Sequence, residues 1–201
     1  MTTTLDTLAL PRDAQDLLFR EARTANAFTD EPVTDEQLHE VYELVKWGPT
    51  EMNSQPLRVL FVRGEEAKAR LVPHMSEGNR AKTLSAPVTA ILAADTDFHE
   101  HLSTTFPHFP GAKGAFVDDA RRAEAAKRSA LLQAGYFIVG VRAAGLAAGP
   151  MSGFDAEGVR REFFVGTNQL PLVVVNIGHP DHSGTRPRNP RLDFAKAARI
   201  I

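Results

Sequence analysis

Two loops interrupted by glycine and proline, one in each half of the chain, constrain this sequence most, together with arginine clusters near both ends. The loops read GPTEMNSQPLR over residues 48–58 and GPMSGFD over 149–155, and the clusters read RTAN over 23–26 and RPRNPR over 186–191. The loops offer amides and backbone N–H groups for a planar polar heterocycle, and the arginines offer cations for a phosphate. Together they indicate a site for flavin mononucleotide (FMN), at which distant segments must meet.

In their order and spacing these segments resemble the FMN-dependent nitroreductase family, and within it the small malonic semialdehyde reductases of pyrimidine degradation. The likeness runs from about residue 17 to the C-terminus. It is carried by KWGPT over 46–50, GN over 78–79 with KT over 82–83, APVTA over 86–90, and the loop over 149–155. No one of these motifs is specific alone, but several in register make chance a poor explanation.

A length of 201 residues suits one domain with a sizeable core. We expect a disordered leader over residues 1–12 and a single FMN-binding domain over 13–201. The net charge of −2 argues against nucleic acid as a partner. No apolar run approaches the ~18–20 residues of a membrane span, and the start of the chain lacks the pattern of a secretory signal, which favours the cytoplasm. The absence of cysteine excludes disulfides and a thiol nucleophile.

Helical signals recur along the chain. Asp13 is expected to cap a helix that runs to about residue 23. Thr34 and Gln37 form the capping-box pattern of a second helix, which should end near Trp47. Further helices are expected over 65–72, over 117–146, where charged residues give way to apolar ones, and from Asp155 to about 164.

Three runs rich in β-branched residues predict strands over residues 57–62, 87–94 and 171–177, the last in a central position. Prolines and glycines interrupt any pattern over 97–116, where we expect a mobile flap. The expected fold class is a three-layer α+β, nitroreductase-like arrangement. It has a central mixed or antiparallel sheet flanked by helices and an extended C-terminal arm.

The resemblance assigns the phosphate of FMN to the two arginine clusters. Arg23, Thr24 and Asn26 take one side of the phosphate, and Arg188 and Arg191 take the other. The planar guanidinium of arginine matches a phosphate through two parallel hydrogen bonds, and a cation is favoured at the helix end expected near Arg23. The family usually has serine in place of Thr24 and a basic residue near Asn26. This interpretation requires the guanidinium groups of Arg23 and Arg191 to converge.

The first loop carries Asn53 and Gln55, whose amides both donate and accept hydrogen bonds, as the pyrimidine edge of a flavin requires. Pro49 stiffens this loop and Thr50 belongs to it. The alternative role of such residues is to form a turn. By resemblance, Lys82 meets a pyrimidine oxygen of the flavin and stabilises negative charge on the reduced ring; an ordinary exposed lysine is the alternative.

The second loop supplies Pro150, Met151, Ser152 and Gly153 to the expected cofactor site. Ser152 and Gly153 precede the helix capped by Asp155, so their N–H groups lie where electron-rich atoms are favoured. In the family a backbone N–H here meets flavin N5, the atom that receives and gives hydride. Many members carry glutamate in place of Ser152. Serine removes a negative charge there, which should ease the binding of an anionic substrate.

These features predict a flavin-dependent oxidoreductase in which FMN carries the hydride and no side chain is a nucleophile. NADPH or NADH is expected as a transient reductant, because no G-x-G-x-x-G fingerprint occurs. The expected acceptor is malonic semialdehyde, reduced to 3-hydroxypropionate, and the alternative is a nitroaromatic or quinone. The resemblance also implies a homodimer with two flavins at the subunit interface and the arm wrapped onto the partner. The sequence leaves open which nicotinamide is used and which chain supplies each flavin contact.

Three other functional classes fit the sequence less well. A metal-dependent hydrolase would rely on His99, Glu100, His101 and His108, which lack the H-E-x-x-H spacing, so no metal is expected. A serine hydrolase would need a G-x-S-x-G elbow, which does not occur. A non-catalytic interaction module could use the apolar stretch over 134–146 as a helical interface.

Overall fold

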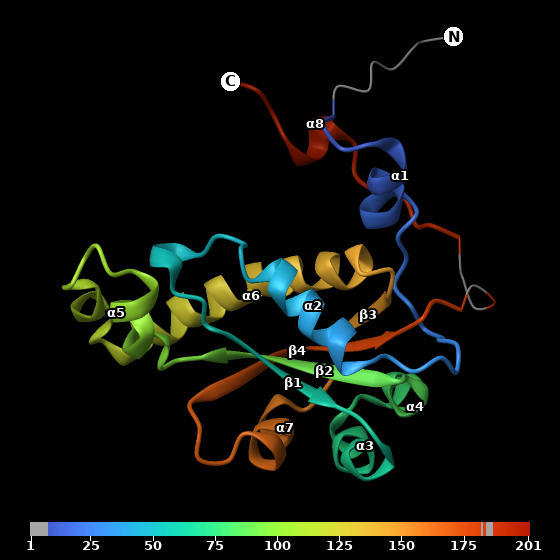
Figure 1. Ribbon diagram of the computed structural model, residues 1–201, viewed down its shortest axis with the longest axis horizontal. Helices are drawn as coiled ribbons and strands as arrows, with labels where there is room; N and C mark the ends of the chain where they lie inside the picture. The colour runs from blue at the N-terminus through green and yellow to red at the C-terminus, as the bar shows by residue number, and fades with distance from the viewer. Residues whose placement is uncertain (1–7, 182, 184–186) are drawn as a thin grey trace.

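The computed structural model describes residues 8–181, 183 and 187–201. In this part of the chain four strands form one antiparallel sheet in the order β1-β2-β4-β3 (Figure 1). They are β1 (Leu57–Val62), β2 (Val88–Asp95), β3 (Ala147–Met151) and β4 (Gln169–Gly178). The three predicted strands are confirmed, and β2 and β4 occupy the inner positions.

Pro171 explains an irregularity between the two inner strands. Their register shifts between Leu92 and Ala93, where Ala93 pairs with Pro171. Proline has no N–H group to donate, so a bulge is where a sheet tolerates it. β4 can therefore contain Pro171 and still pair with β2 from Val88 to Asp95.

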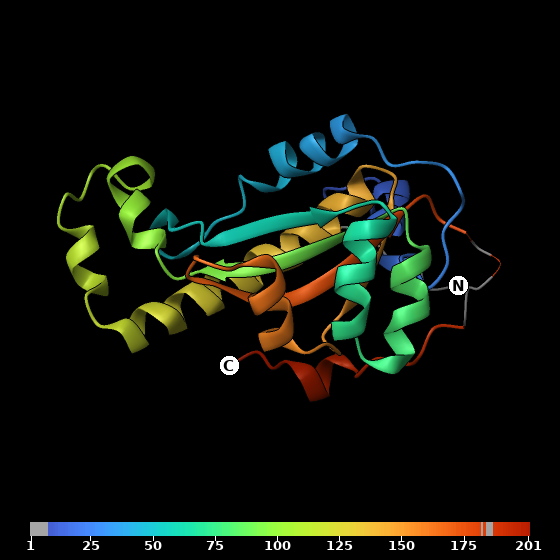
Figure 2. The same cartoon turned by 90° about the horizontal axis from the view of Figure 1, so that it is seen from below.

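Eight α-helices are described. They are α1 (Arg12–Gln15), α2 (Asp35–Val45), α3 (Glu65–Leu71), α4 (Glu77–Ser85), α5 (Leu102–Thr105), α6 (Asp119–Ala143), α7 (Ala156–Phe163) and α8 (Phe194–Ala197). Shorter helical turns cover Asp16–Arg20, of π type, and Glu51–Asn53, Val72–His74, Phe98–His101 and Ala112–Phe116, of 3₁₀ type. Helices α2 and α6 cover one face of the sheet, and α3, α4 and α7 lie on the other (Figures 1 and 2).

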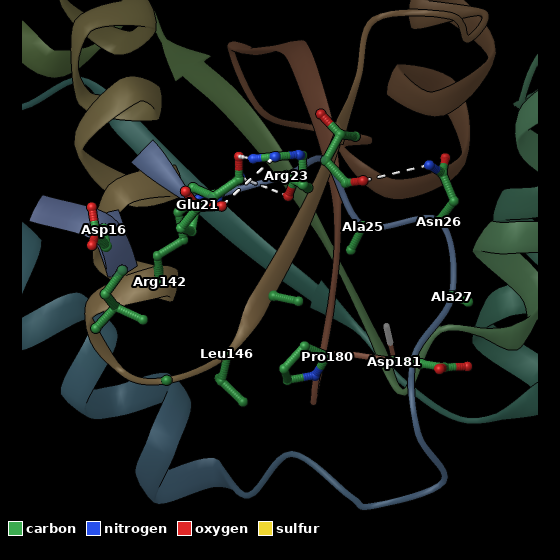
Figure 3. A pocket seen from close by; sticks show the side chains of 15 residues that line it. Asp16, Glu21, Arg23, Ala25, Asn26, Ala27, Arg142, Leu146, Pro180 and Asp181 are labelled. Atoms are coloured by element: carbon green, nitrogen blue, oxygen red, sulfur yellow. Dashed lines mark hydrogen bonds and ion pairs between the residues drawn. The ribbon is translucent and has the colours of Figure 1, made fainter. Parts of the chain in front are cut away.

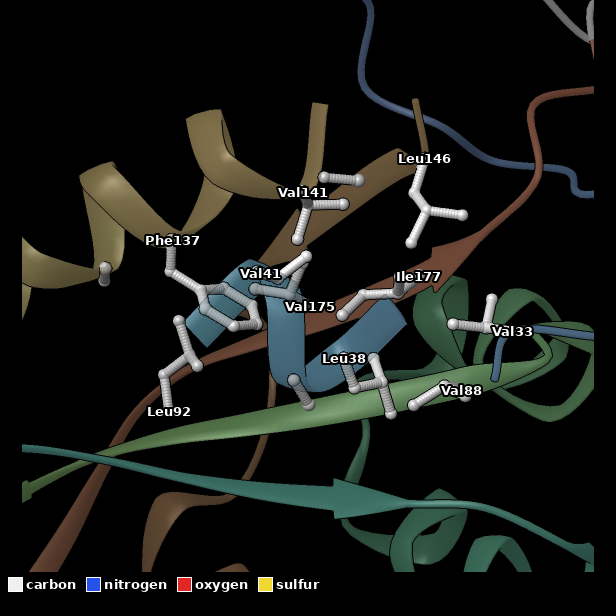
Figure 4. Packing of buried hydrophobic residues seen from close by; sticks show 13 residues of the cluster. Val33, Leu38, Val41, Val88, Leu92, Phe137, Val141, Leu146, Val175 and Ile177 are labelled. Carbon is white, nitrogen blue, oxygen red and sulfur yellow. The ribbon is translucent and has the colours of Figure 1, made fainter. Parts of the chain in front are cut away.

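The side chains of β2 divide the core between these layers. Val88, Ala90 and Leu92 face α2 and α6, in a cluster completed by residues such as Phe137 and Val141 (Figure 4). Ile91 and Ala93 alternate with them and pack toward α3 and α7. A strand buried on both faces has no polar side, which explains its continuous apolar run. The three-layer α+β prediction is confirmed.

Local capping signals fix several helix boundaries. Thr34 accepts a hydrogen bond from the Gln37 N–H (3.2 Å), and the Gln37 side chain accepts one from the Thr34 N–H (2.9 Å), as the capping box predicts. The Asp155 carboxylate caps α7 by accepting from the Gly158 N–H (3.0 Å). Helix α2 ends at Val45, before the predicted Trp47, and α6 is shorter at both ends than residues 117–146.

The first helix differs from its prediction. It begins at Arg12 after Pro11, and the Asp13 carboxylate accepts from the neighbouring Ala14 N–H, inside the first turn instead of at the cap. Proline favours the start of a helix, because its fixed φ suits the first turn and its missing N–H is not needed there. The π-helical turn then ends at Arg20, so the predicted extension to residue 23 is wrong.

Residues 97–116 form a packed lobe and not a patternless loop. Phe98 and Phe116 meet edge to face with ring centroids 4.9 Å apart, and Leu102 joins them. This cluster packs on Ala126 and Ala130 of α6. Pro107, Pro110 and Gly111, which conceal the pattern, lie between its helical turns, whereas Gly114 lies inside the last of them.

The C-terminal arm, residues 187–201, is extended except for α8, and near its start Arg188 donates to backbone carbonyls of the N-terminal segment (Figure 1). Its large apolar side chains are exposed, with 66% of Phe194 and 90% of Ile200 accessible. Residues 1–7 of the expected leader, and Arg186 of the second arginine cluster, lie outside the described residues. The division into leader and domain stays a prediction.

Two glycines of α6 provide a matched test of the packing between α2 and α6. A Cβ at Gly140 would lie 2.1 Å from Val45 Cγ1, whereas one at Gly135 would meet nothing within 4 Å. Gly140→Ala should lower the free energy of unfolding by about 1–3 kcal/mol because it overpacks this contact. Gly135→Ala should raise it by about 0.5–1 kcal/mol, since alanine favours a helix.

Urea unfolding at one protomer concentration measures both changes. Combining Gly140→Ala with Val45→Ala should recover part of the loss, because it removes the methyl group that the new Cβ meets. Equal effects of the two single substitutions would contradict this account of the contact.

Candidate ligand-binding site

Four arginines line one cavity of about 520 Å³. Arg23 follows the π-helical turn, Arg142 comes from the last turn of α6, and Arg188 and Arg191 come from the C-terminal arm. Among the described residues that line this cavity, none is acidic. The structure thus brings residues of both arginine clusters into the wall of one cavity of a single chain. Thr24 and Asn26 line the same cavity.

Backbone carbonyls hold two of these guanidinium groups in place. Arg23 Nη1 donates to the carbonyls of Arg20 (3.4 Å) and Ala22 (3.2 Å). Arg188 Nη2 donates to the same two carbonyls and to that of Phe19. Carbonyls at the end of a helix lack intrahelical partners and attract cations. The expected charge–dipole contact therefore exists, although Arg23 lies beyond the helix and folds back onto it.

Arg142 was not predicted as a site residue. Its Nη2 donates to the Arg23 carbonyl at 2.8 Å. Burial lowers the pKa of the Arg142 guanidinium, and the positive charges of Arg188 and Arg23 lower it further. The sequence contains one signal that could have found it: Arg142 is a charged residue near the end of the apolar half of α6.

A glycine in β3 allows the N-terminal segment to reach this position. The Ala25 N–H donates to the Ala148 carbonyl (3.0 Å), and a Cβ at Gly149 would lie 2.5 Å from the Ala25 carbonyl oxygen. Only glycine permits this approach without displacing the backbone. A neighbouring cavity of about 400 Å³ shares Arg23, Asn26 and Arg142 in its wall (Figure 3).

Asn26 and Lys82 connect this region to α4. Lys82 Nζ lies 3.5 Å from Asn26 Oδ1, and Asn26 Nδ2 lies 3.4 Å from the Thr24 carbonyl. Lys82 is half-buried, so it is more constrained than a fully solvated lysine. These contacts place Lys82 beside the first arginine cluster, residues 23–26.

The second loop is held against α4 through Gly153. The Gly153 carbonyl accepts from the Ser76 N–H (3.0 Å) and from Asn79 Nδ2 (2.9 Å). Pro150 and Met151 belong to β3, and Ser152 is exposed beyond it. The bonds that fix this loop do not use the N–H groups of Ser152 and Gly153. These two N–H donors are therefore left for a ligand, on a loop that is held against α4.

The first loop contains a hydrogen-bond relay with a fixed polarity. Asn53 Nδ2 donates to the Thr105 carbonyl (2.7 Å), and Asn53 Oδ1 accepts from Gln55 Nε2 (3.0 Å). A backbone carbonyl can only accept, so it orients the Asn53 amide, which in turn orients that of Gln55. The relay leaves Gln55 Oε1 as an available acceptor. Thr50 supports the loop by accepting from the Gln55 N–H (3.2 Å).

The backbone of this loop is conformationally unusual. Met52, Asn53 and Gln55 have φ values of 50°, 48° and 44°. Non-glycine residues seldom adopt positive φ, and such residues gather at functional sites. The amide-bearing residues thus also carry the strain, which sequence reasoning did not predict.

The first loop and the arginine cavity lie at different points along α6. Pro49 accepts a hydrogen bond from the Tyr136 hydroxyl (3.2 Å), and Glu51 pairs with Arg128 (3.1 Å), whereas Arg142 lies at the cavity. A rise of 1.5 Å per residue separates Arg128 from Arg142 by about 21 Å. Figures 1 and 2 show the same separation, with the first loop near α5 and away from α1. One chain therefore does not join all the predicted site residues.

No metal cluster occurs among the described residues: no three histidine, cysteine, aspartate or glutamate side chains gather as ligands there. His99 Nε2 instead lies 3.5 Å from Glu100 Oε1 within the lobe. Nor is any described helix both long and apolar enough to cross a membrane.

Comparisons with known proteins agree on one family. Residues 19–179 match the model of the nitroreductase family. The chain is 61% identical over 195 residues to a Streptomyces coelicolor protein named "Putative NADH dehydrogenase/NAD(P)H nitroreductase", covering 96% of this chain and 99% of the relative. A Leptothrix cholodnii protein of the same name is 54% identical over 202 residues and is matched over the full length of both chains.

Solved structures share the fold. A nitroreductase from Exiguobacterium sibiricum, described as a complex with FMN, matches with a TM-score of 0.82 and 18% identity, covering 97% of this chain and 100% of the other. The ydfN nitroreductase of Bacillus subtilis matches with a TM-score of 0.82 and 23% identity, covering 92% and 97%. The predicted nitroreductase-like fold is therefore confirmed.

Removing the Asn53 amide tests whether the relay holds the lobe. Asn53→Gly deletes the side chain and keeps a residue that adopts positive φ without strain. Losing one hydrogen bond of about 0.5–1.5 kcal/mol should speed hydrogen exchange in the backbone of residues 102–106 by about two- to tenfold. Exchange in α7 should not change, and unchanged exchange in 102–106 would show that the lobe is held without Asn53.

Proposed function

We propose that this chain, which belongs to the nitroreductase family, is an FMN-dependent oxidoreductase that passes hydride from NAD(P)H to a small second substrate. One observation carries the proposal: among the described residues, four arginines and no carboxylate line a single cavity of about 520 Å³. The names of the relatives and the FMN complex of the Exiguobacterium sibiricum structure support the same cofactor and reductant.

The residues present fit the phosphate of FMN. A phosphate monoester carries nearly two negative charges and accepts hydrogen bonds, and guanidinium groups match it in charge and geometry. Arg23 Nε is buried and has no hydrogen-bond partner among the described residues. Burying an unsatisfied donor is costly. An anion that reoriented the Arg23 guanidinium would relieve that cost.

The remaining contacts suit the ring. Bound FMN would supply the hydride-transfer chemistry, and the protein would bind, orient and tune it. The N–H groups of Ser152 and Gly153, beside the capped start of α7, favour an electron-rich atom. Lys82 adds a positive charge near Asn26 and can stabilise negative charge on a reduced ring. Gln55 Oε1, fixed by the relay, offers an acceptor to an N–H of a heterocycle.

A homodimer would unite the two groups of site residues. The first loop lies away from the arginine cavity of its own chain, so a second copy could supply it. Large apolar side chains are exposed on the same molecule: 80% of Trp47 is accessible, as are 51% of Leu131 and 48% of Leu132 on α6. An exposed apolar surface of this kind suits a partner. The arm, with its exposed Phe194, would then pack on the second copy. We place this homodimer in the cytoplasm.

We propose malonic semialdehyde as the acceptor, reduced to 3-hydroxypropionate. The support is the uncharged Ser152 where the family resemblance expects glutamate, in a loop bonded to α4, the helix that also carries Lys82. A carboxylated aldehyde would meet fewer negative charges here. A nitroaromatic or quinone acceptor is the second candidate, favoured by the names of the relatives.

Direct comparison of oxidants tests the acceptor. The protein is loaded with FMN, reduced anaerobically with NADPH or NADH, and mixed in a stopped-flow instrument with malonic semialdehyde, a nitroaromatic or a quinone. Reoxidation by the aldehyde at least as fast as by the other two is expected. Failure of the aldehyde alone would replace it with the second candidate, and failure of NADPH and NADH to reduce the flavin would reject the oxidoreductase.

Charge at position 152 should affect only an anionic acceptor. Ser152→Glu should raise KM for malonic semialdehyde about fivefold or more, since two like charges about 4 Å apart repel by on the order of 1 kcal/mol even in water. KM for a neutral aldehyde of similar size should stay within about twofold. Ser152→Gln is the matched control, because it adds the same bulk without charge. An equal rise for both aldehydes would attribute the effect to bulk.

A further inference from the structure

Arg142 reaches the candidate phosphate site from a different element than the predicted arginines. It comes from the end of α6 and is half-buried, and it lines both the arginine cavity and its neighbour. Its Nη2 donates to the Arg23 carbonyl at 2.8 Å, across 119 residues of sequence. A guanidinium has five N–H donors, so this bond leaves others for a ligand.

The charges around Arg142 are unbalanced. Arg188 and Arg23 are its electrostatic neighbours, and together with burial they lower the pKa of its guanidinium. The carboxylate paired with Arg23, that of Glu21, lies 3.8 Å away and is 73% exposed, so solvent screens it. Asp16 and Asp181 line the neighbouring cavity and not the arginine cavity. Like charges brought together with only this exposed carboxylate as an ion-pair partner of Arg23, among the described residues, oppose one another until an anion binds.

Two effects of Arg142 therefore act on the same ligand. Its hydrogen bond fixes the backbone at Arg23 and so directs the guanidinium that follows. Its charge raises the positive potential of a cavity that no carboxylate lines in the part of the chain that the structure describes. A neutral part of the ligand gains nothing from the charge, whereas a phosphate monoester gains from both effects.

We propose that Arg142 is a positioning residue for the phosphate monoester of the bound nucleotide, and that a phosphate dianion stabilises this chain by neutralising the four-arginine cluster. This inference rests on the proposed FMN function and adds to it a residue of α6. It also adds a property of the cofactor-free protein: inorganic phosphate should stabilise it against heat.

The test compares FMN with riboflavin, which has the same ring and ribityl chain but no phosphate. Arg142→Gln should weaken FMN binding by roughly ten- to a hundredfold, the loss expected for one charge-assisted contact. Riboflavin binding should change less than about twofold. Arg142→Lys, which keeps the charge without the planar fork, should lose less than Arg142→Gln. Lys127→Gln is the control, because Lys127 is exposed on the same helix and lies about 22 Å from Arg142 along the helix axis.

Thermal unfolding of the cofactor-free protein provides a second readout. Inorganic phosphate should raise Tm of the wild type and of Lys127→Gln, and should raise Tm of Arg142→Gln clearly less. Equal losses for FMN and riboflavin, or a phosphate effect that Arg142→Gln leaves intact, would overturn the inference. A wild type that binds riboflavin as tightly as FMN would instead reject the proposed phosphate site itself.

Discussion

The close approach of the Ala25 carbonyl to Gly149 is the contact on which the candidate site depends. Because a Cβ at Gly149 would lie 2.5 Å from that oxygen, glycine lets the N-terminal segment lie against β3. The segment is then fixed by the hydrogen bond from the Ala25 N–H to the Ala148 carbonyl. Its position brings Arg23 to the end of α6, where Arg142 binds its carbonyl, and brings Asn26 to Lys82. Cations from four segments are thus assembled at one edge of the sheet.

The first loop, residues 48–58, is held by separate contacts. It is fixed by α6 and by the 97–116 lobe, through Tyr136 and the Thr105 carbonyl, at a different point along α6 from Arg142 and the arginine cavity. Each half of the candidate site is therefore rigid in its own surroundings. Preorganisation lowers the entropy lost on binding, but only if the halves meet. The proposed homodimer is the assembly in which they would.

Much of the fold could be predicted because its signals are local. The capping residues Thr34 and Asp155 act on N–H groups three residues away, so sequence spacing reveals them. The run around Val174 has no polar face, so its burial follows from composition. Strand β3 was missed because Gly149 and Pro150 disfavour strands, and its stability comes from pairing with β4. Helix α4 was missed because its sequence is mostly polar.

The candidate site was predictable where residue type alone determines the chemistry. Arginine at positions 23, 188 and 191 suggested a phosphate wherever the chain placed it, and the structure brings them together. Arg142 could not be placed, because its role depends on where the end of α6 meets a segment more than a hundred residues earlier. The positive φ values around Asn53 were equally hidden, since tertiary contacts impose them.

The hydrogen bond from Asn53 to the Thr105 carbonyl joins the first loop of a chain to the 97–116 lobe of the same chain. In the proposed homodimer this loop serves the flavin held by the other copy. A substitution inside the lobe of one subunit would then alter the acceptor selectivity of the active site that holds the other subunit's flavin. In a heterodimer of two natural variants, the acceptor selectivity of each active site would consequently follow the chain that supplies its first loop, and not the chain that supplies its arginines.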